Sequence, residues 1–271
     1  SRRQRQMCIR DRFNSFEEKA SKGNLIPVYA ELSADYETPI SVYQKICDGQ
    51  FSFLLESAES TDRAGRFSFI GSDPRAVIEA RGPNIKISKG NKVDEFQSEC
   101  GDSLKELEVF MSSYLPVSVS GLPVFYGGAV GYLSYDAVRY FEPTINEPAN
   151  DDLGLPHMVF MITQNVVIFD HRLRKFLIVS NVFTEEGEEL QTLYDNASKE
   201  IGKIIQKLDR SLDFRPLIKG VKSDNVKYKS NTSKDEYYDM VNKAKEFIHS
   251  GDAFQIVLSQ RFEVDFPGTS I

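Results

Sequence analysis

The residues whose types could do chemistry gather in one stretch, Ala253–Val264. Its even-numbered positions are mostly apolar, whereas its odd-numbered positions include Gln255, Ser259 and Arg261. Because successive side chains of a strand point to opposite faces, a strand here would present an amide, a hydroxyl and a guanidinium in a row. A guanidinium can bind a carboxylate through two parallel hydrogen bonds. The pattern leaves two interpretations open: a solvated polar face, or one wall of a pocket for an anionic ligand.

A second candidate lies at the end of an apolar strand predicted over residues 51–56. There Leu55, Glu56 and Ser57 stand where the strand passes into a polar loop. Loops often carry binding groups, because they can be shaped around a ligand without disturbing the ladder of the sheet. The alternative is that Ser57 only begins a turn.

Other familiar catalytic patterns are absent from the sequence. Gly127, Gly128 and Gly131 lack both common phosphate-loop spacings, so they predict a bulge or a close backbone approach within a strand. Asp136 and Arg139, three residues apart on a short predicted helix, could pair. There is no GxSxG or HExxH motif, and the three histidines are too widely spaced for a metal motif.

Composition bounds the class of protein. With 271 residues, 41% hydrophobic and 27% charged, the chain has the composition of a globular protein of about two domains. No apolar run approaches the roughly 18 residues of a membrane-spanning helix, so no membrane partner is expected. Three cysteines without a CxxC pair favour a reducing compartment. We therefore expect a cytoplasmic protein, with a plastid as the alternative if a natural N-terminal segment has been lost.

Charge is unevenly distributed along the chain. The net charge is −7, but the first twelve residues contribute +4 and the remainder −11. An acidic body argues against nucleic acid as a partner. The basic head contains MCIRDR, which resembles a translated sequencing adapter. We therefore interpret residues 1–13 as a non-native extension and exclude them from the fold prediction.

Hydrophobic periodicity predicts an α+β fold of mostly antiparallel sheets packed with helices. Residues 14–209 form an N-terminal domain, residues 210–232 a polar linker, and residues 233–271 the start of a second, truncated domain. The expected strands cover residues 24–30, 51–56, 66–70, 76–80, 84–88, 157–163, 166–170, 176–182 and 253–264, and the three from 157 to 182 suggest an antiparallel meander. The expected helices are 38–46, a helix capped by Asp102, 134–141, 184–209, and a helix behind the capping box of Ser233 and Glu236.

Five segments resemble the large subunit (component I) of the anthranilate synthase family. In order they are NLIPVYA (24–30), FSFLLESAE (51–59), RFSFIGSDPR (66–75), GLPVFYGGAVGYLSYDAVRYFEP (121–143) and GDAFQIVLSQRF (251–262). Each is modest by itself, but five in family order form a specific signal. They cover almost everything from about residue 24 to the end of the sequence.

The resemblance implies a reaction and its partners. The family condenses chorismate with ammonia and eliminates pyruvate to give anthranilate, using Mg²⁺. A glutamine amidotransferase subunit supplies the ammonia, and L-tryptophan inhibits the enzyme. The resemblance also implies that the Mg²⁺ ligands and the catalytic histidine lie in a region that this sequence lacks. We therefore expect the fragment alone to be inactive and to hold no metal site.

The resemblance assigns roles to the candidate residues. Leu55, Glu56 and Ser57 match the segment that contributes to the tryptophan pocket. Gln255 matches a position at which isochorismate-forming relatives place a lysine that activates water. Because an amide has no usable basicity, Gln255 favours ammonia over water as the nucleophile. Ser259 and Arg261 remain candidates for the pocket wall.

Three alternatives stay open at this point. Aminodeoxychorismate synthase component I shares the fold and also carries glutamine at the matching position. A non-catalytic tryptophan-binding module formed by residues 24–220 would bind its ligand without the second domain. A purely structural β-rich adaptor would bind no ligand at all.

Overall fold

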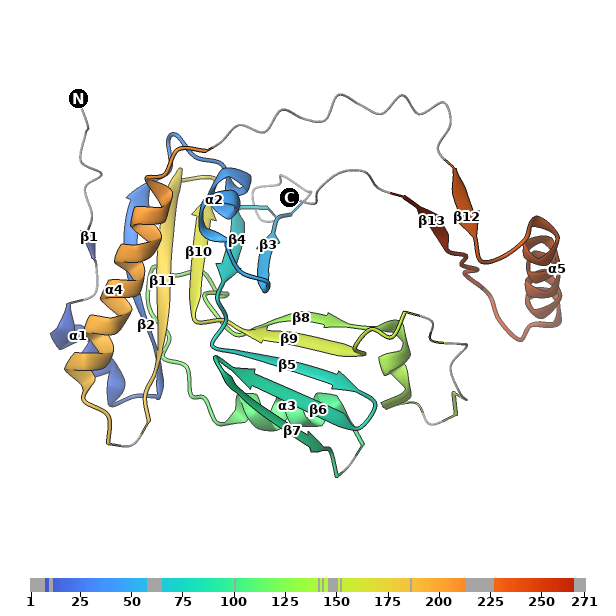
Figure 1. Ribbon diagram of the computed structural model, residues 1–271, viewed down its shortest axis with the longest axis horizontal. Helices are drawn as coiled ribbons and strands as arrows, with labels where there is room; N and C mark the ends of the chain where they lie inside the picture. Colours follow the sequence, from blue (N-terminus) through green and yellow to red (C-terminus); the bar gives the residue numbers. More distant parts are fainter. Residues whose placement is uncertain are drawn as a thin grey trace. The chain divides into compact units, whose positions relative to one another are not determined.

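Antiparallel strands form two sheets in the first of the chain's two compact units, Ser1–Leu212 (Figure 1). The computed structural model describes residues 8–9, 12–57, 65–99, 101–140, 142, 144–145, 151, 153–185, 187–212 and 227–265. Within them, one sheet has the strand order β1-β2-β11-β10-β4-β3 and the other the order β7-β6-β5-β9-β8. The mixed α+β class predicted from the sequence is confirmed.

The strand bounds follow the apolar runs of the sequence closely. The first sheet contains β1 (Cys8–Ile9), β2 (Leu25–Ser33), β3 (Ser52–Leu55), β4 (Phe67–Ser72), β10 (Asn165–Asp170) and β11 (Lys175–Phe183). The second contains β5 (Ala76–Arg81), β6 (Asn84–Lys89), β7 (Lys92–Gln97), β8 (Ala129–Leu133) and β9 (Met158–Ile162). The predicted hairpin of β5 and β6 is confirmed, whereas β7, whose six residues are all exposed, was missed.

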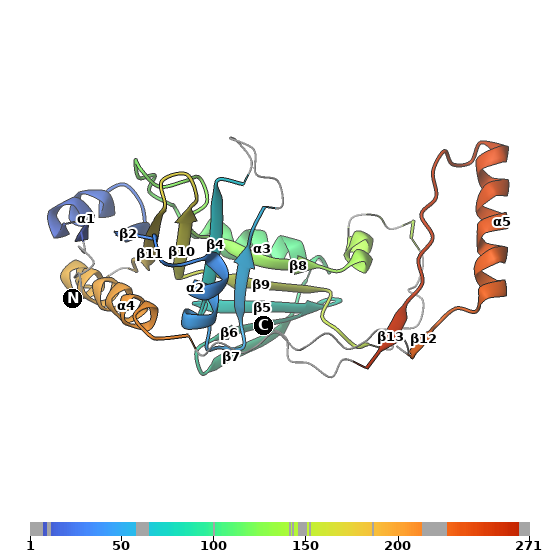
Figure 2. The same ribbon diagram turned by 90° about the horizontal axis from the view of Figure 1, so that it is seen from above.

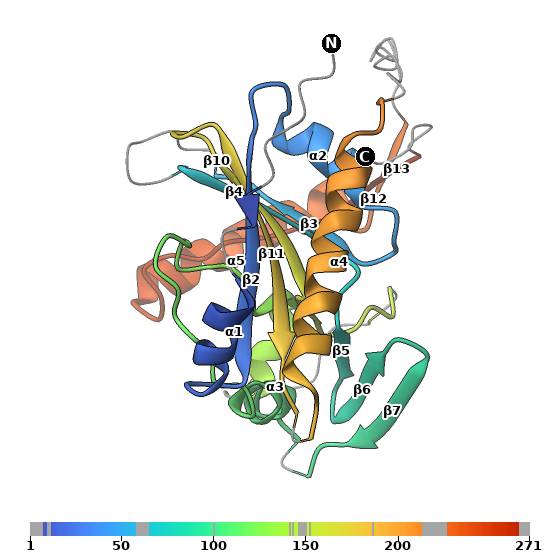
Figure 3. The same ribbon diagram turned by 90° about the vertical axis from the view of Figure 1, so that its left-hand side faces the viewer.

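Helices α1 (Phe13–Ala20), α2 (Pro39–Ile46) and α4 (Leu190–Leu208) pack on the first sheet (Figures 2 and 3). Their apolar side chains form one core with one face of the sheet, while Tyr29, Val166 and Ile168 belong to a separate core on the other face. The segment 117–126 covers that other face through Val119, Leu122 and Tyr126. Because both faces are covered, β10 and β11 are almost continuously apolar.

Local capping signals fixed the helix starts where the sequence predicted them. Thr38 and Ser41 cap α2 reciprocally, and Asp102 caps α3 (Ser103–Ser112). Helix α3 packs its apolar stripe on the second sheet. The predicted helix at 134–141 is a 3₁₀ helix, Tyr135–Tyr140, in which Arg139 and Asp136 pair at 3.1 Å. The helix predicted from residue 184 begins later, at Leu190.

Two lysines cap the C-terminal ends of α2 and α4 reciprocally. Lys45 Nζ donates to the Leu208 carbonyl at 3.1 Å, and Lys207 Nζ donates to the Ile46 carbonyl at 3.2 Å. Both carbonyls belong to the last turn of a helix, where no intrahelical donor is available and a cation is favoured. Lys45 also pairs with the buried carboxylate of Glu37, so its charge is compensated.

The chain passes from one sheet to the other at a corner formed by two neighbouring strand pairs. Residues 73–75 lead from β4 into β5, and residues 163–164 lead from β9 into β10. Strands β4 and β10 are paired in the first sheet, and β5 and β9 in the second. The predicted meander over residues 157–182 is therefore wrong, because β9 pairs with β5 and β8 and only β10 and β11 form a hairpin. Apolar runs specify strands but do not specify their neighbours.

Gly131 sits where β8 approaches β9 too closely for a side chain. A Cβ atom added there would lie 1.8 Å from the Val159 carbonyl oxygen. The close backbone approach that the glycine pattern predicted is thus confirmed.

The second compact unit, Asp213–Ile271, contains α5 (Lys234–Ser250) and a two-stranded sheet of β12 (Tyr228–Ser230) and β13 (Phe262–Val264). The Ser233–Glu236 capping box is confirmed, and Gly251 ends α5 in the left-handed conformation. The predicted strand over residues 253–264 is wrong except for its last three residues. A strand needs a ladder partner, and β12 pairs only with Phe262–Val264.

Two segments predicted to lie outside the domains, residues 1–13 and 210–232, contain residues of regular elements. Cys8 and Ile9, within the supposed extension, pair with Glu31 and Ala30 of β2, and Phe13 begins α1. Strand β12 lies inside the predicted linker, of which residues 213–226 fall outside the described part of the chain.

Substituting Gly131→Ala is expected to destabilise the protein by about 3 kcal/mol, because the new methyl group must displace the backbone of β9. Chemical denaturation followed by circular dichroism measures the change. Gly202→Ala is the matched control, since nothing lies within 4 Å of an added Cβ there. In the interior of α4 it should stabilise by about 1 kcal/mol. Equal effects of the two substitutions would contradict the close approach.

Candidate functional site

An open cavity of about 620 Å³ lies where β3 ends. Its lining residues come from the end of β3, the start of β4 and the segment before β8, and they are Leu55, Glu56, Ser57, Gly65, Arg66, Phe67, Phe69 and Phe125. All three residues predicted at the end of the strand therefore line one cavity. Residues 58–64, which begin the loop beyond Ser57, fall outside the described part of the chain.

Three phenylalanines form the apolar wall of this cavity. Phe69 pairs with Leu55 across the β3–β4 ladder, and its ring meets Phe125 edge-on at a centroid distance of 5.1 Å. The ring centroids of Phe67 and Phe69 lie 6.2 Å apart. The main chain beside Phe125 is fixed, because Asn181 Nδ2 donates to the Tyr126 carbonyl at 2.9 Å. Such a wall suits a flat, aromatic ligand.

An ion pair at the start of β4 borders the cavity. Arg66 donates to both carboxylate oxygens of Asp170, at 2.7 and 3.3 Å. Burial alone would raise the pKa of Asp170, but hydrogen bonds from Arg66 and from the Leu173 and Arg172 amides outweigh it and lower the pKa below its ordinary value. The same carboxylate thus holds the β10–β11 turn and the start of β4.

Glu56 belongs to a second polar group beside the cavity. The Ser68 hydroxyl lies 3.5 Å from Glu56 Oε1 and 2.8 Å from His171 Nε2. The His171 amide donates to the Arg66 carbonyl at 2.9 Å, which continues the β4–β10 ladder. The His171 ring also lies against Phe169 at 4.6 Å. Two adjacent strands therefore hold this group in place.

The residues predicted in the second unit are not aligned on a strand. Gln255 and Ser259 are exposed and lie outside regular structure. Arg261 binds the Glu263 carboxylate with two nitrogens, at 2.9 and 3.1 Å, and its amide donates to Asn231 at 2.8 Å. The expected carboxylate fork therefore holds a carboxylate of the protein itself. The pocket-wall role of Gln255, Ser259 and Arg261 stays a prediction.

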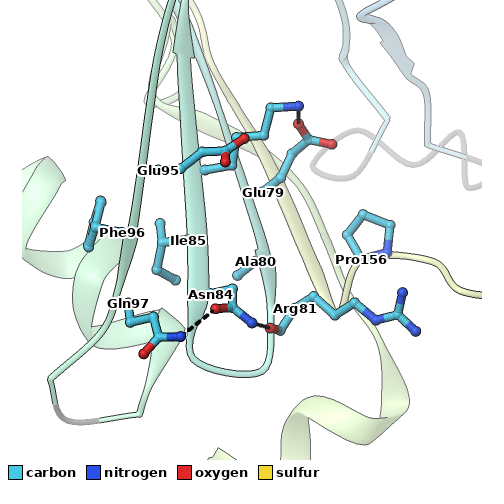
Figure 4. Close-up of a pocket in the computed structure, with 10 residues that line it drawn as sticks. Glu79, Ala80, Arg81, Asn84, Ile85, Glu95, Phe96, Gln97 and Pro156 are labelled. Carbon is cyan, nitrogen blue, oxygen red and sulfur yellow. Dashed lines mark hydrogen bonds and ion pairs between the residues drawn. The ribbon is translucent and has the colours of Figure 1, made fainter.

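Another open cavity, of about 510 Å³, lies over strands β5, β6 and β7 (Figure 4). Four of its polar residues pair with one another: Lys86 with Glu79 at 3.5 Å, and Gln97, which donates to Asn84 at 3.1 Å. Mutually paired groups of this kind are typical of a solvated sheet face. We find no reactive constellation in this cavity.

The described part of the chain contains neither a group of metal ligands nor a membrane-spanning helix. There, no group of three or more His, Cys, Asp or Glu side chains could hold a metal ion, so these residues do not fit a Mg²⁺ site. Within the same residues, no helix is both long enough and apolar enough to cross a membrane. Cys47 is a free thiol, and burial raises its pKa to about 12, which keeps it unreactive.

Comparison with known proteins gives the family. The model of the chorismate binding enzyme family matches residues 50–271. The chain belongs to this family. Anthranilate synthase component 1 of Aquifex aeolicus is 36% identical over 90% of the chain and 49% of its own length. The Saccharomyces cerevisiae protein of the same name is 37% identical over 88% of the chain and 46% of its own length.

A solved structure supports the same grouping. Anthranilate synthase component I from Streptococcus pneumoniae TIGR4 superposes with a TM-score of 0.56 at 25% identity, covering 88% of this chain and 49% of that one. The chain thus spans about half the length of the relatives that it matches.

The sequence of this family member did not predict most of the cavity wall. Phe67 follows Arg66 directly and Phe69 lies two positions further on, but their pattern indicated only a strand. Phe125 lies more than fifty residues away, and Arg66 and Asp170 are 104 positions apart. Arg66 and Asp170 each stand at the end of an apolar run, which was a weak signal. No feature of the sequence near either residue indicated that the two pair.

Substituting Asp170→Asn should lower the free energy of unfolding at pH 7 by about 1 to 2 kcal/mol, because it removes a charge-assisted pair whose arginine is partly screened by solvent. The folded-state pKa lies below the unfolded value of about 3.9. The contribution is therefore complete above about pH 4 and is lost as the pH falls through the folded-state pKa. Urea titrations from pH 7 to pH 3 measure the difference. Asp94→Asn, on the exposed strand β7, is the control, and a pH-independent difference for Asp170→Asn would contradict the assignment.

Proposed function

We propose that this chain is part of an anthranilate synthase component I, which converts chorismate and ammonia to anthranilate and pyruvate. The observation that carries the proposal is the 36% identity to an anthranilate synthase component 1 over 90% of the chain, a match that continues through both compact units. Gln255 supports it, because an amide there cannot activate water as a base. The neutral side chain leaves ammonia as the nucleophile.

The wider assignment adds a partner, an ion and a location. A glutamine amidotransferase subunit would supply the ammonia, and Mg²⁺ would assist the reaction. The described residues offer no metal site, so we assign none of them to the ion. A reducing compartment, the cytoplasm, is proposed because Cys47 is a free thiol.

We further infer that the cavity at the end of β3 takes L-tryptophan as a feedback inhibitor. Its wall of Phe67, Phe69 and Phe125 suits an indole ring, and its rim carries polar groups of Glu56 and Ser57. An aromatic wall beside a hydroxyl suits an aromatic amino acid, whereas chorismate is a dicarboxylate, and Arg66, the cation among the described lining residues, is already bound by Asp170.

The reaction is tested on a protein extended to the full length of the relatives. Anthranilate fluorescence is followed from chorismate, Mg²⁺ and ammonium, with and without L-tryptophan. We expect anthranilate formation that tryptophan suppresses, and no turnover by the 271-residue chain alone. Consumption of chorismate without anthranilate would instead support aminodeoxychorismate synthase component I. No consumption by the extended protein would reject both enzymes and favour the tryptophan-binding module.

The aromatic wall gives a separate prediction. Phe125→Ala should raise the tryptophan inhibition constant about tenfold, because it removes one edge-on ring from the wall. The turnover of chorismate without tryptophan should stay within about twofold. Phe96→Ala is the matched control, since Phe96 is a half-exposed ring that lines the other cavity. Inhibition that is unchanged in both variants would place the tryptophan site elsewhere.

A further inference from the structure

We propose that Glu56 is a positioning residue, held by Ser68 and His171, and that Leu55 and Ser57 face the ligand in its place. The proposal rests on the tryptophan pocket inferred above and refines it. Under this proposal Glu56 stabilises the end of β3 and does not contact the ligand itself. It also adds two residues, Ser68 and His171, to the machinery that shapes the pocket.

The alternation of side chains separates Glu56 from its neighbours. Leu55 pairs with Phe69, and Phe69 belongs to the core on the cavity side of the sheet. Ser68, one residue earlier on β4, points to the opposite face, where Ile70 packs in the core covered by the helices. The contact between Glu56 and Ser68 therefore turns the carboxylate toward that opposite face.

Hydrogen-bond chemistry gives the group a direction. An ionised carboxylate only accepts hydrogen bonds, so the Ser68 hydroxyl must donate to Glu56. The His171 ring nitrogen 2.8 Å away must then donate to the Ser68 oxygen. This order requires the proton of a neutral His171 to sit on Nε2. The chain of donors runs from His171 through Ser68 to Glu56.

Burial makes this arrangement costly to abandon. Ser68 is 1% exposed, and a buried hydroxyl that loses its partner carries a desolvation penalty. Charged groups near His171 include Glu56, reached through Ser68, the Arg66–Asp170 pair, and Arg172, which follows His171 in the chain. Because Asp170 is already held by Arg66 and two turn amides, Glu56 is the acceptor that Ser68 reaches.

The two roles predict different tolerance of a neutral side chain at this position. A positioning role needs an acceptor oxygen, which glutamine also has. A direct contact with the ligand's ammonium needs the negative charge, which glutamine lacks. In the full-length protein, calorimetry should show that Glu56→Gln binds L-tryptophan within about threefold of wild type. Glu56→Ala should bind at least about tenfold more weakly.

Two outcomes would overturn the proposal. Equal losses in Glu56→Gln and Glu56→Ala would show that the charge itself meets the ligand. Unchanged binding in both would show that Glu56 has neither role. Ser68→Ala should resemble Glu56→Ala, and Ser72→Ala is the matched control, because Ser72 lies on the same face of β4 four residues away.

A second measurement does not depend on tryptophan. Nuclear magnetic resonance of the His171 ring should show the Nε2–H tautomer in the wild-type protein. Glu56→Gln should keep the tautomer, because glutamine retains an acceptor oxygen for the Ser68 hydroxyl. Ser68→Ala should abolish the tautomer preference. An Nδ1–H tautomer in wild type would overturn the proposal, whereas failure of tryptophan to bind with this tautomer intact would reject only the proposed ligand.

Discussion

The corner at which two paired strands leave one sheet and enter the other is the constraint on which the first unit depends. Neither sheet can shift without the other, because β4 continues into β5 while its neighbour β10 follows from β9. Thr163 holds this corner by bonding both the amide and the carbonyl of Gly128. Gly127 also packs closely there, since an added Cβ would meet Nδ2 of Asn181, the side-chain amide that donates to the Tyr126 carbonyl.

The positions of the aromatic residues in the cavity wall depend on this corner. Phe125 is set by the segment that Asn181 and Thr163 pin, and Phe69 is set by β4. At the other end of the same strands, the Arg66–Asp170 pair fixes the start of β4 against the β10–β11 turn. A strand held at both ends presents its aromatic residues with little freedom. Rigid support of this kind is what a preorganised binding cavity requires.

What the sequence could predict was local. Thr38, Asp102 and Ser233 mark helix starts, because a cap involves only residues three or four positions apart. The resemblance to a family located the cavity through Leu55–Ser57. Pairing between distant strands was not predictable from periodicity, which is why the meander was wrong and Phe125 was missed. The strand expected over residues 253–264 shows the same limit, since an alternating pattern forms a strand only where a partner completes its ladder.

The reciprocal lysine caps of α2 and α4 have a mechanical consequence. Helix ends commonly fray, so a pull on the chain after Leu208 would be expected to unwind the last turn of α4 first. Here Lys45 of α2 donates to the Leu208 carbonyl in that turn, and Lys207 of α4 donates to the Ile46 carbonyl at the end of α2. A force applied to the chain at Leu212 would therefore be distributed over two helices, α2 and α4, that pack on the same sheet. Since α2 also contacts β3, the two lysine bonds link the C-terminal end of α4 to the strand that leads into the cavity.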